Sequence, residues 1–315
     1  MAIFYLVAGI ALLILGGEYL VKSSVGISLK FNLSRIVIGM TVVSFATSLP
    51  ELLVSINAAL QGHPDLALSN VVGSNIANIA MVLGATAILT PIFIKKVSYI
   101  FNIPVMIFIS LLLYWFLKND LILSFAEGAI LFILLIIFII ALIKRSSTSD
   151  SVDLEEIDED VEHSSNFKIL LWLIIGGAAL WGGSELLVKG AVELAKALGV
   201  SERIIGVSIV AIGTSIPELA ASVISALKKE KDLSLGNLIG SNIFNIGSVL
   251  GITAMIKPIH VLDVKLINND ILWMLATAIL LIPLALLPKR NKISWKKGTL
   301  YIIFYISYIY LVVRA

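Results

Sequence analysis

Long apolar runs separated by short polar segments fill most of this sequence. A helix crosses a bilayer with roughly 20 mostly apolar residues. Residues 66–94 and 97–117 carry no charge, and residues 121–143 carry only Glu127. The pattern predicts an all-α polytopic membrane protein with ten transmembrane helices. The predicted spans are residues 2–21, 36–61, 66–94, 97–117, 121–143, 169–188, 204–227, 233–256, 271–287 and 298–313.

The composition supports a membrane class. Of the 315 residues, 59% are hydrophobic and 14% are charged, whereas soluble domains are about half apolar and a quarter charged. A soluble enzyme is therefore excluded, and the net charge of +2 gives no reason to expect nucleic acid as a partner. The chain has no Cys and three widely separated His, so neither a thiolate site nor a zinc-type cluster is expected. The first span has no basic leading segment, so we interpret it as a retained helix.

Basic residues predict the orientation in the plasma membrane, because Lys and Arg accumulate in cytoplasmic loops. The odd-numbered loops hold 16 Lys and Arg and the other side holds 7. Both termini are therefore predicted to be extracellular. Residues 144–168 then form an acidic cytoplasmic linker. It lacks the Gly of a calcium-binding loop, which favours a solvated linker over a cation-sensing role.

An internal repeat is the strongest signal in the sequence. Residues 39–91 align without a gap on residues 206–258, 167 positions later, and 26 of the 53 positions are identical. Identity concentrates in two patches, where residues 47–52 match 214–219 and residues 73–79 match 240–246.

Each half of the chain holds five predicted spans. Five is odd, so the second half enters the membrane from the opposite side, and the ten helices form two inverted five-helix repeats. We assign residues 1–143 and 169–315 to the two repeats, with the linker between them. Inverted repeats are typical of secondary transporters, whose substrate sites lie near the membrane midplane.

Glu51 and Glu218 are equivalent carboxylates in the middle of predicted spans. An ionised carboxylate there costs roughly 2.5–3.5 kcal/mol, and neither residue has a Lys or Arg nearby in its own span. An exchangeable cation held by the pair would offset that cost. The alternative is a protonated glutamate that forms a helix–helix hydrogen bond.

Pro50 and Pro217 directly precede the two glutamates. A proline removes the hydrogen bond to the carbonyl four residues earlier, here that of Ala46 or Gly213. Free carbonyls at membrane depth are tolerated only where protein or water satisfies them, and we expect a cation to do so here. The same turns carry the hydroxyls of Thr47, Ser48, Thr214 and Ser215.

The second patch adds amide and hydroxyl oxygens. Ser74 and Asn78 are one helical turn apart and share a face, and Ser241 and Asn245 repeat the arrangement. The combined all-oxygen set suits a hard cation such as Ca²⁺. Two carboxylates neutralise one divalent ion, and sodium ions or protons can neutralise the same pair in turn.

Two other acids are interpreted as structural. Glu18 and Glu185 precede Lys22 and Lys189 by four residues, the spacing that favours an ion pair on one helix. They are left outside the site.

The Thr-Ser-x-Pro-Glu and Gly-Ser-Asn-Ile-x-Asn-Ile patches resemble the two alpha-repeats of the calcium/cation antiporter superfamily, in its sodium/calcium exchanger branch. The resemblance covers essentially the whole chain. It implies that the second, third, seventh and eighth helices surround the ions, while the first and sixth helices slide across them. It also implies that Glu51 and Glu218 bind Ca²⁺ and that the remaining ligands are Thr47, Ser48, Thr214, Ser215, Ser74, Asn78, Ser241 and Asn245, with backbone carbonyls from Ser44 and Ala211.

One position departs from the pattern, because some sodium/calcium exchangers carry Asp where this chain has Asn245. That difference leaves the stoichiometry and any potassium dependence open. The proton/calcium branch typically has Gly-Asn-x-x-Glu in place of Thr-Ser-x-Pro-Glu, so proton coupling is the second alternative.

The sequence therefore predicts a sodium/calcium antiporter that works by alternating access, with Ca²⁺ and Na⁺ as its substrates and no cofactor. Both halves of the site lie in one chain, so a monomer should suffice. A passive channel is disfavoured by the single carboxylate in each half. An intramembrane enzyme is disfavoured because no hydrolase motif accompanies the carboxylates.

Overall fold

The computed structural model describes residues 1–146, 159–199, 211–287 and 291–314, and these are predominantly helical. In the first half the elements are α1 (Ala2–Phe31), α2 (Arg35–Ile38), η1 (Gly39–Val43), α3 (Ser44–Thr47), α4 (Leu49–Leu60), α5 (Pro64–Ile76), η2 (Ala77–Val82), α6 (Leu83–Leu89), β1 (Ile92–Phe93), η3 (Ser98–Asn102), α7 (Ile103–Asp120), β2 (Ile122–Leu123) and α8 (Phe125–Ser146).

The second half follows the same order. It contains α9 (Glu159–Glu162), α10 (Asn166–Ala197), α12 (Ala211–Gly213), α13 (Ile216–Leu227), α14 (Lys231–Phe244), η5 (Asn245–Leu250), α15 (Gly251–Ile256), β3 (Ile259–His260), η6 (Leu266–Asp270), α16 (Ile271–Leu286), β4 (Lys292–Ile293) and α17 (Trp295–Arg314). The η elements are π-helical turns that continue directly into neighbouring α-helices.

Seven helices among the described residues are long and apolar enough to cross a membrane. The helical segments Arg35–Thr47 and Leu49–Leu60 meet at a bend of 44°, and counted together as one span they would make an eighth. Of the other two predicted spans, residues 204–227 begin outside the described part of the chain and continue as α13, and residues 298–313 lie within α17. Much of the predicted linker, residues 147–158, also lies outside the described residues.

Two helices are longer than predicted. The sequence suggested spans over residues 2–21 and 169–188, but α1 has 30 residues and α10 has 32. The charged Lys22 and Lys189 end the apolar stretch without ending the helix. Past this point α1 is polar on its buried side, where the Ser23 and Ser24 hydroxyls donate to the Leu20 carbonyl.

The bend in the second span follows from its proline. Ser48 has φ −87° and ψ 2°, which interrupts the helix, and Pro50 lies in the first turn of α4. Ser215 repeats this backbone geometry, with φ −90° and ψ 3°, just before Pro217 in α13. Both halves therefore have the same interruption of the helix just before the proline.

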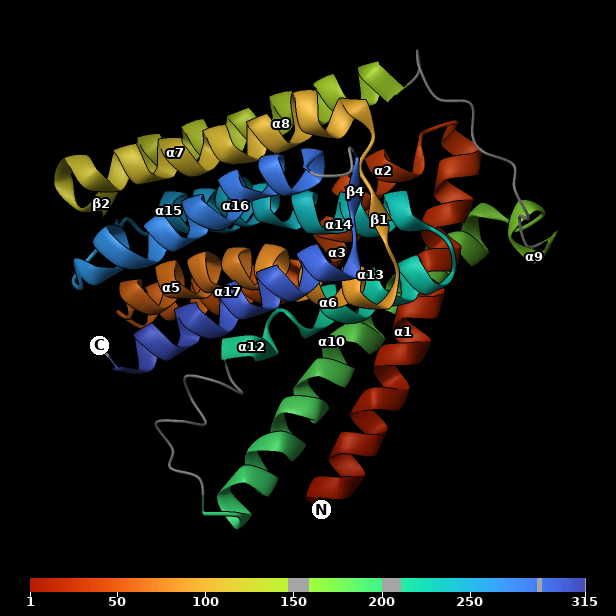
Figure 1. Cartoon of the computed structure of the whole chain (residues 1–315), viewed down its shortest axis with the longest axis horizontal. Coiled ribbons are helices and arrows are strands. Elements are labelled where there is room, and N and C mark those ends of the chain that lie inside the picture. The colour runs from red at the N-terminus through yellow and green to blue at the C-terminus, as the bar shows by residue number, and fades with distance from the viewer. Residues whose placement is uncertain (147–158, 200–210, 288–290, 315) are drawn as a thin grey trace.

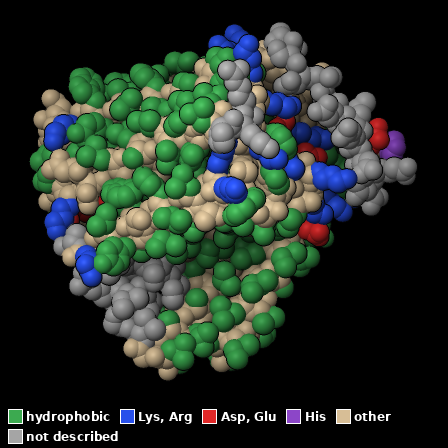
Figure 2. Space-filling model, viewed as in Figure 1, with side chains coloured by type: hydrophobic (Ala, Val, Ile, Leu, Met, Phe, Trp, Pro, Cys, Tyr) green, Lys and Arg blue, Asp and Glu red, His purple; other side chains and the backbone are tan. Residues whose placement is uncertain are grey.

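The helices form a bundle from which α1 and α10 project together, side by side (Figure 1). Two short antiparallel strand pairs join the halves: β1 pairs with β4, with Ile92 opposite Ile293, and β2 pairs with β3, with Ile122 opposite His260. Figure 2 shows hydrophobic side chains over most of the visible face, as expected for a surface in contact with lipid.

A glycine stripe lets α1 and α10 pack with their backbones in contact. Gly9 lies against Gly183 and Gly16 lies against Gly176, so the two helices run antiparallel. A Cβ atom on Gly16 would lie 2.7 Å from the Leu180 backbone nitrogen, closer than a side chain can approach. The pair therefore depends on glycine at these positions.

Glu18 forms an ion pair with Lys228, a residue that the sequence did not predict as its partner. Its Oε1 lies 3.1 Å from Nζ of Lys228, which caps the end of α13. The expected partner was Lys22 on the same helix, whose ammonium lies 5.9 Å from the centre of the Trp172 ring. The acid of α1 thus contacts the second half of the chain.

Candidate functional site

Glu51 and Glu218 lie in the first turns of α4 and α13, and both are fully buried. None of their four carboxylate oxygens has a hydrogen-bond partner. The positive end of a helix dipole favours a carboxylate in the first turn, but this contribution is much smaller than the cost of burying a charge. At this depth the pair is therefore favoured either with a bound cation or in a protonated form.

Neutral oxygens without partners accompany the carboxylates. They are Oγ of Ser48 and Ser215 and Oδ1 of Asn78 and Asn245. With the glutamates they account for eight of the fourteen buried side-chain atoms that lack a partner in the described part of the chain. A buried polar atom without a partner costs about 1–3 kcal/mol, so this concentration of partnerless oxygens makes the region a candidate cation site.

The partnerless oxygens of this region belong to two carboxylates and to neutral side chains. No cluster of three or more His, Cys, Asp or Glu occurs among the residues that the structure describes. The candidate ligands for a cation here are therefore the two carboxylates together with the neutral amide and hydroxyl oxygens.

The predicted threonines and serines bridge the two halves. Oγ1 of Thr47 lies 3.3 Å from Oγ of Ser241, and Oγ of Ser74 lies 3.1 Å from Oγ1 of Thr214. These pairs are equivalent under the 167-residue shift. A hydroxyl of α3 thus meets one of α14, and a hydroxyl of α5 meets one of the turn before α13.

Asn75 and Asn242 are central to the hydrogen bonds between the two halves, although neither was among the predicted site residues. Nδ2 of Asn78 donates to Oδ1 of Asn242 at 3.1 Å, and Nδ2 of Asn245 donates to Oδ1 of Asn75 at 3.0 Å. Each amide nitrogen is therefore occupied, and the Oδ1 atoms of Asn78 and Asn245 stay free as acceptors. The signal was available, because both residues are identical in the repeated patch.

A second asparagine pair supports the glutamate helices. Nδ2 of Asn70 donates to the Glu51 carbonyl at 3.3 Å and to Oγ of Ser55 at 3.0 Å. Asn237 makes the matching bond to Oγ of Ser222, at 3.0 Å. These asparagines also coincide in the repeat, and they fix α4 against α5 and α13 against α14.

One of the two carbonyls freed by the prolines has a hydrogen-bond partner within the protein. The sequence predicted that a cation satisfies the Gly213 carbonyl, but Oγ of Ser184 on α10 donates to it at 2.8 Å. The equivalent position on α1 is Gly17, which has no hydroxyl. The two halves of the site therefore differ in their contact with the projecting helices.

Ser44 and Ala211 were expected to supply backbone carbonyls. The Ser44 hydroxyl donates to the carbonyls of Gly39 at 2.8 Å and Asn237 at 3.0 Å, which ties α3 to α14. Ala211 begins α12, two residues before Gly213.

Known proteins resemble this chain over nearly its full length. The family model for the sodium/calcium exchanger protein matches residues 1–144 and 168–314. The putative antiporter CaxA of Alkalimonas amylolytica is 39% identical over 98% of both chains. The sodium/calcium exchanger MaX1 of Methanosarcina acetivorans is 30% identical over 96% of both chains.

A solved structure has the same fold. The sodium-calcium exchanger NCX_Mj, in a form soaked without Na⁺ and Ca²⁺, matches with a TM-score of 0.83 and 33% identity over 98% of both chains. The sequence resemblance and the similarity of the whole fold agree. This chain is a multi-pass membrane protein that belongs to the sodium/calcium exchanger family.

Proposed function

We propose that this protein is a secondary antiporter that exchanges Na⁺ for Ca²⁺ across the plasma membrane by alternating access. The observation that carries the proposal is the buried, unpartnered pair Glu51 and Glu218. Hard cations prefer all-oxygen sites, and Ca²⁺ takes 6–8 oxygen ligands. The names of the relatives MaX1 and NCX_Mj support the same two ions.

The proposed ligands are the carboxylates and the oxygens around them. Glu51 and Glu218 bind Ca²⁺ directly. The amide oxygens of Asn78 and Asn245 face the same cation, because their nitrogens are bonded to Asn242 and Asn75. Sodium binding involves Thr47, Ser48, Thr214 and Ser215. The hydroxyls of Ser74 and Ser241 and the backbone carbonyls of Ser44 and Ala211 complete the proposed set of ligands.

Charge neutralisation couples the two ions. An empty site carries two buried negative charges, which resist transfer through the apolar part of the membrane. One Ca²⁺ or a set of Na⁺ ions removes that cost. Because the two kinds of ion use overlapping oxygens, each must leave before the other binds, and the protein exchanges them. Both carboxylates come from one chain, so a monomer is sufficient.

We also propose the ten-span, inverted-repeat topology, with repeats at residues 1–143 and 169–315 and both termini outside. The 167-residue shift places α4 on α13, and the equivalent helices α1 and α10 run antiparallel, as repeats of opposite orientation require. The projecting pair α1 and α10 is the moving element in this scheme.

Transport in proteoliposomes tests the proposal. Vesicles loaded with Na⁺ should take up ⁴⁵Ca²⁺ when diluted into Na⁺-free buffer, and vesicles loaded with K⁺ or choline should not. Uptake that ignores Na⁺ and follows a pH gradient would identify the alternative, a proton/calcium antiporter with the same carboxylates. Uptake that needs no counter-ion gradient would contradict antiport and favour a channel.

A further inference from the structure

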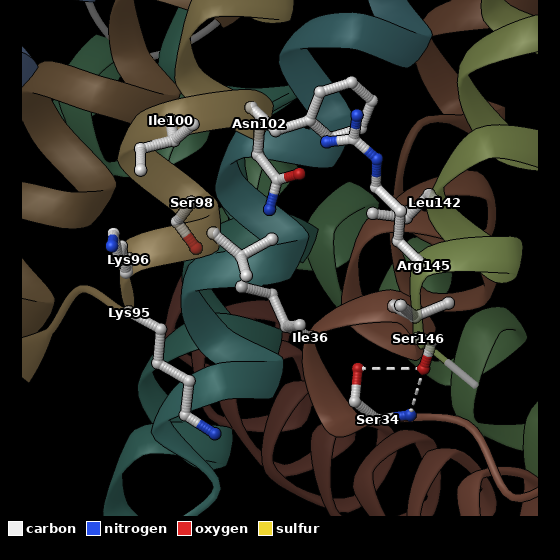
Figure 3. A pocket seen from close by; sticks show the side chains of 13 residues that line it. Ser34, Ile36, Lys95, Lys96, Ser98, Ile100, Asn102, Leu142, Arg145 and Ser146 are labelled. Carbon is white, nitrogen blue, oxygen red and sulfur yellow. Dashed lines mark hydrogen bonds between the residues drawn. The ribbon is translucent and has the colours of Figure 1, made fainter. Parts of the chain in front are cut away.

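We propose a second binding site in this protein: a basic pocket, distant in sequence from Glu51 and Glu218, that binds an anionic phosphate group. The inference does not depend on ion exchange. The pocket has a volume of about 260 Å³ and lies between the start of α2, the segment 95–102 and the end of α8. Its polar lining, shown in Figure 3, is Ser34, Lys95, Lys96, Ser98, Asn102 and Arg145, together with Ser146.

Two fully buried side chains in the pocket lack partners. Ser98 and Asn102 have no exposed surface, yet Oγ of Ser98 and both polar atoms of the Asn102 amide make no hydrogen bond. In Figure 3 both side chains point toward the space that the labelled residues enclose. The Ser98 hydroxyl and the Asn102 amide nitrogen are donors, so a bound ligand with acceptor oxygens would satisfy these two groups, whereas Oδ1 of Asn102 would accept from a donor such as a ligand hydroxyl.

The charge of the lining selects an anion. Lys95, Lys96 and Arg145 line the pocket, and none of the 13 lining residues is acidic. Lys95 also pairs with Asp232 at 2.8 Å, and the Arg145 guanidinium lies 3.9 Å from the centre of the Phe101 ring, which holds it in place. A guanidinium presents paired donors that match phosphate oxygens.

Exposed apolar side chains border the pocket. Ile100 and Val97, which are 57% and 42% exposed, line it beside the polar groups. If the phosphate of a phospholipid binds at Ser98 and Asn102, the acyl chains of that lipid can therefore pack against exposed apolar side chains. Basic pockets between membrane helices are typical sites for lipid headgroups, so the phosphate of an anionic glycerophospholipid fits better than free phosphate.

Binding to the purified full-length protein in neutral detergent tests this site. Apparent affinities come from the saturable rise in melting temperature with dioctanoyl phosphatidylglycerol, with inorganic phosphate, and with dioctanoylglycerol, which has the same chains without phosphate. The phosphatidylglycerol should stabilise the protein and dioctanoylglycerol should not. Saturation by inorganic phosphate alone would assign the same pocket to the free anion.

Variants distinguish lipid binding in the pocket from nonspecific attraction of the lipid to surface charge. Lys96→Gln with Arg145→Gln should weaken phosphatidylglycerol binding by at least about tenfold, since each charge near a phosphate contributes on the order of 1 kcal/mol. Lys296→Gln is the matched control, because Lys296 is exposed beside the Trp295 ring and does not line the pocket.

The uncharged donors provide an independent readout. Ser98→Ala and Asn102→Ala should weaken lipid binding without lowering the melting temperature of the lipid-free protein, because these groups make no hydrogen bond there. Equal stabilisation by phosphatidylglycerol and dioctanoylglycerol, or lipid affinity unchanged in all pocket variants, would overturn the proposal.

Discussion

Asn75 and Asn242 exchange hydrogen bonds across the two halves of the protein. Nδ2 of Asn75 donates to the Asn242 carbonyl at 3.2 Å, and Nδ2 of Asn242 donates to the Asn75 carbonyl at 3.1 Å. The residues are 167 positions apart, so the bonds are related by the internal repeat. The same side chains orient Asn78 and Asn245 through their Oδ1 atoms.

Replacing Asn75 with Ala should reduce both stability and Ca²⁺ affinity. The change removes the bond to Asn242 and leaves Nδ2 of Asn245 without its acceptor. We expect the free energy of unfolding to fall by about 1–3 kcal/mol. Melting temperatures and Ca²⁺ titrations in detergent measure the two effects. Asn57→Ala is the control, since Asn57 bonds only the exposed Gln61 among the contacts described. Equal behaviour of the two variants would contradict the central role of Asn75.

Glu51→Gln and Glu218→Gln should each abolish sodium-driven ⁴⁵Ca²⁺ uptake and leave a folded protein. Glutamine keeps the shape and removes one of the two charges that neutralise a divalent cation. The melting temperature without Ca²⁺ should not fall, because an uncharged side chain is easier to bury. Glu127→Gln is the control: Glu127 lies in the first turn of α8 and accepts from Ser124. Uptake at the parent rate in both glutamate variants would remove these residues from the site.

Gly176→Ala should separate α1 from α10. A Cβ atom on Gly176 would lie 2.7 Å from the Leu20 backbone nitrogen, whereas a Cβ atom on the next residue, Gly177, meets nothing within 4 Å. Overpacking of this kind costs about 1–3 kcal/mol, so Gly176→Ala should lower the melting temperature and slow transport. Gly177→Ala should do neither, because alanine is the better helix former and its Cβ atom meets no neighbour there. A similar loss in both variants would contradict the proposed role of the close contact between the two helices.

Ser184→Ala should change transport without a large loss of stability. The Ser184 hydroxyl links the projecting helix α10 to the Gly213 carbonyl, beside the turn that leads to Glu218. Loss of one hydrogen bond of about 1 kcal/mol corresponds to a change of roughly fivefold in the apparent Ca²⁺ affinity. Ser110→Ala removes a buried bond of the same length, 2.8 Å, within α7. If both variants transport alike, Ser184 has only a structural role.

The membrane class could be predicted from the sequence, because hydropathy depends on residues that are neighbours in the chain. The repeated patches and the family could also be predicted, because the two halves align at a constant offset of 167 residues. The bend at Ser48 was predictable for the same reason: Pro50 acts on its own helix. The limits of α1 and α10 were not, because charged residues end an apolar run without ending the hydrogen bonds of a helix.

Contacts between distant helices were decided by the tertiary structure. Glu18 has a suitable partner four residues away, yet it pairs with Lys228. Likewise, the Gly213 carbonyl accepts a hydrogen bond from the Ser184 hydroxyl, whereas the sequence predicted only a cation as its partner. The sequence determined which polar groups enter the membrane. Only the packing of the helices decided which of those groups satisfy one another and which oxygens remain free, because a buried group bonds to whatever partner the fold brings within about 3 Å.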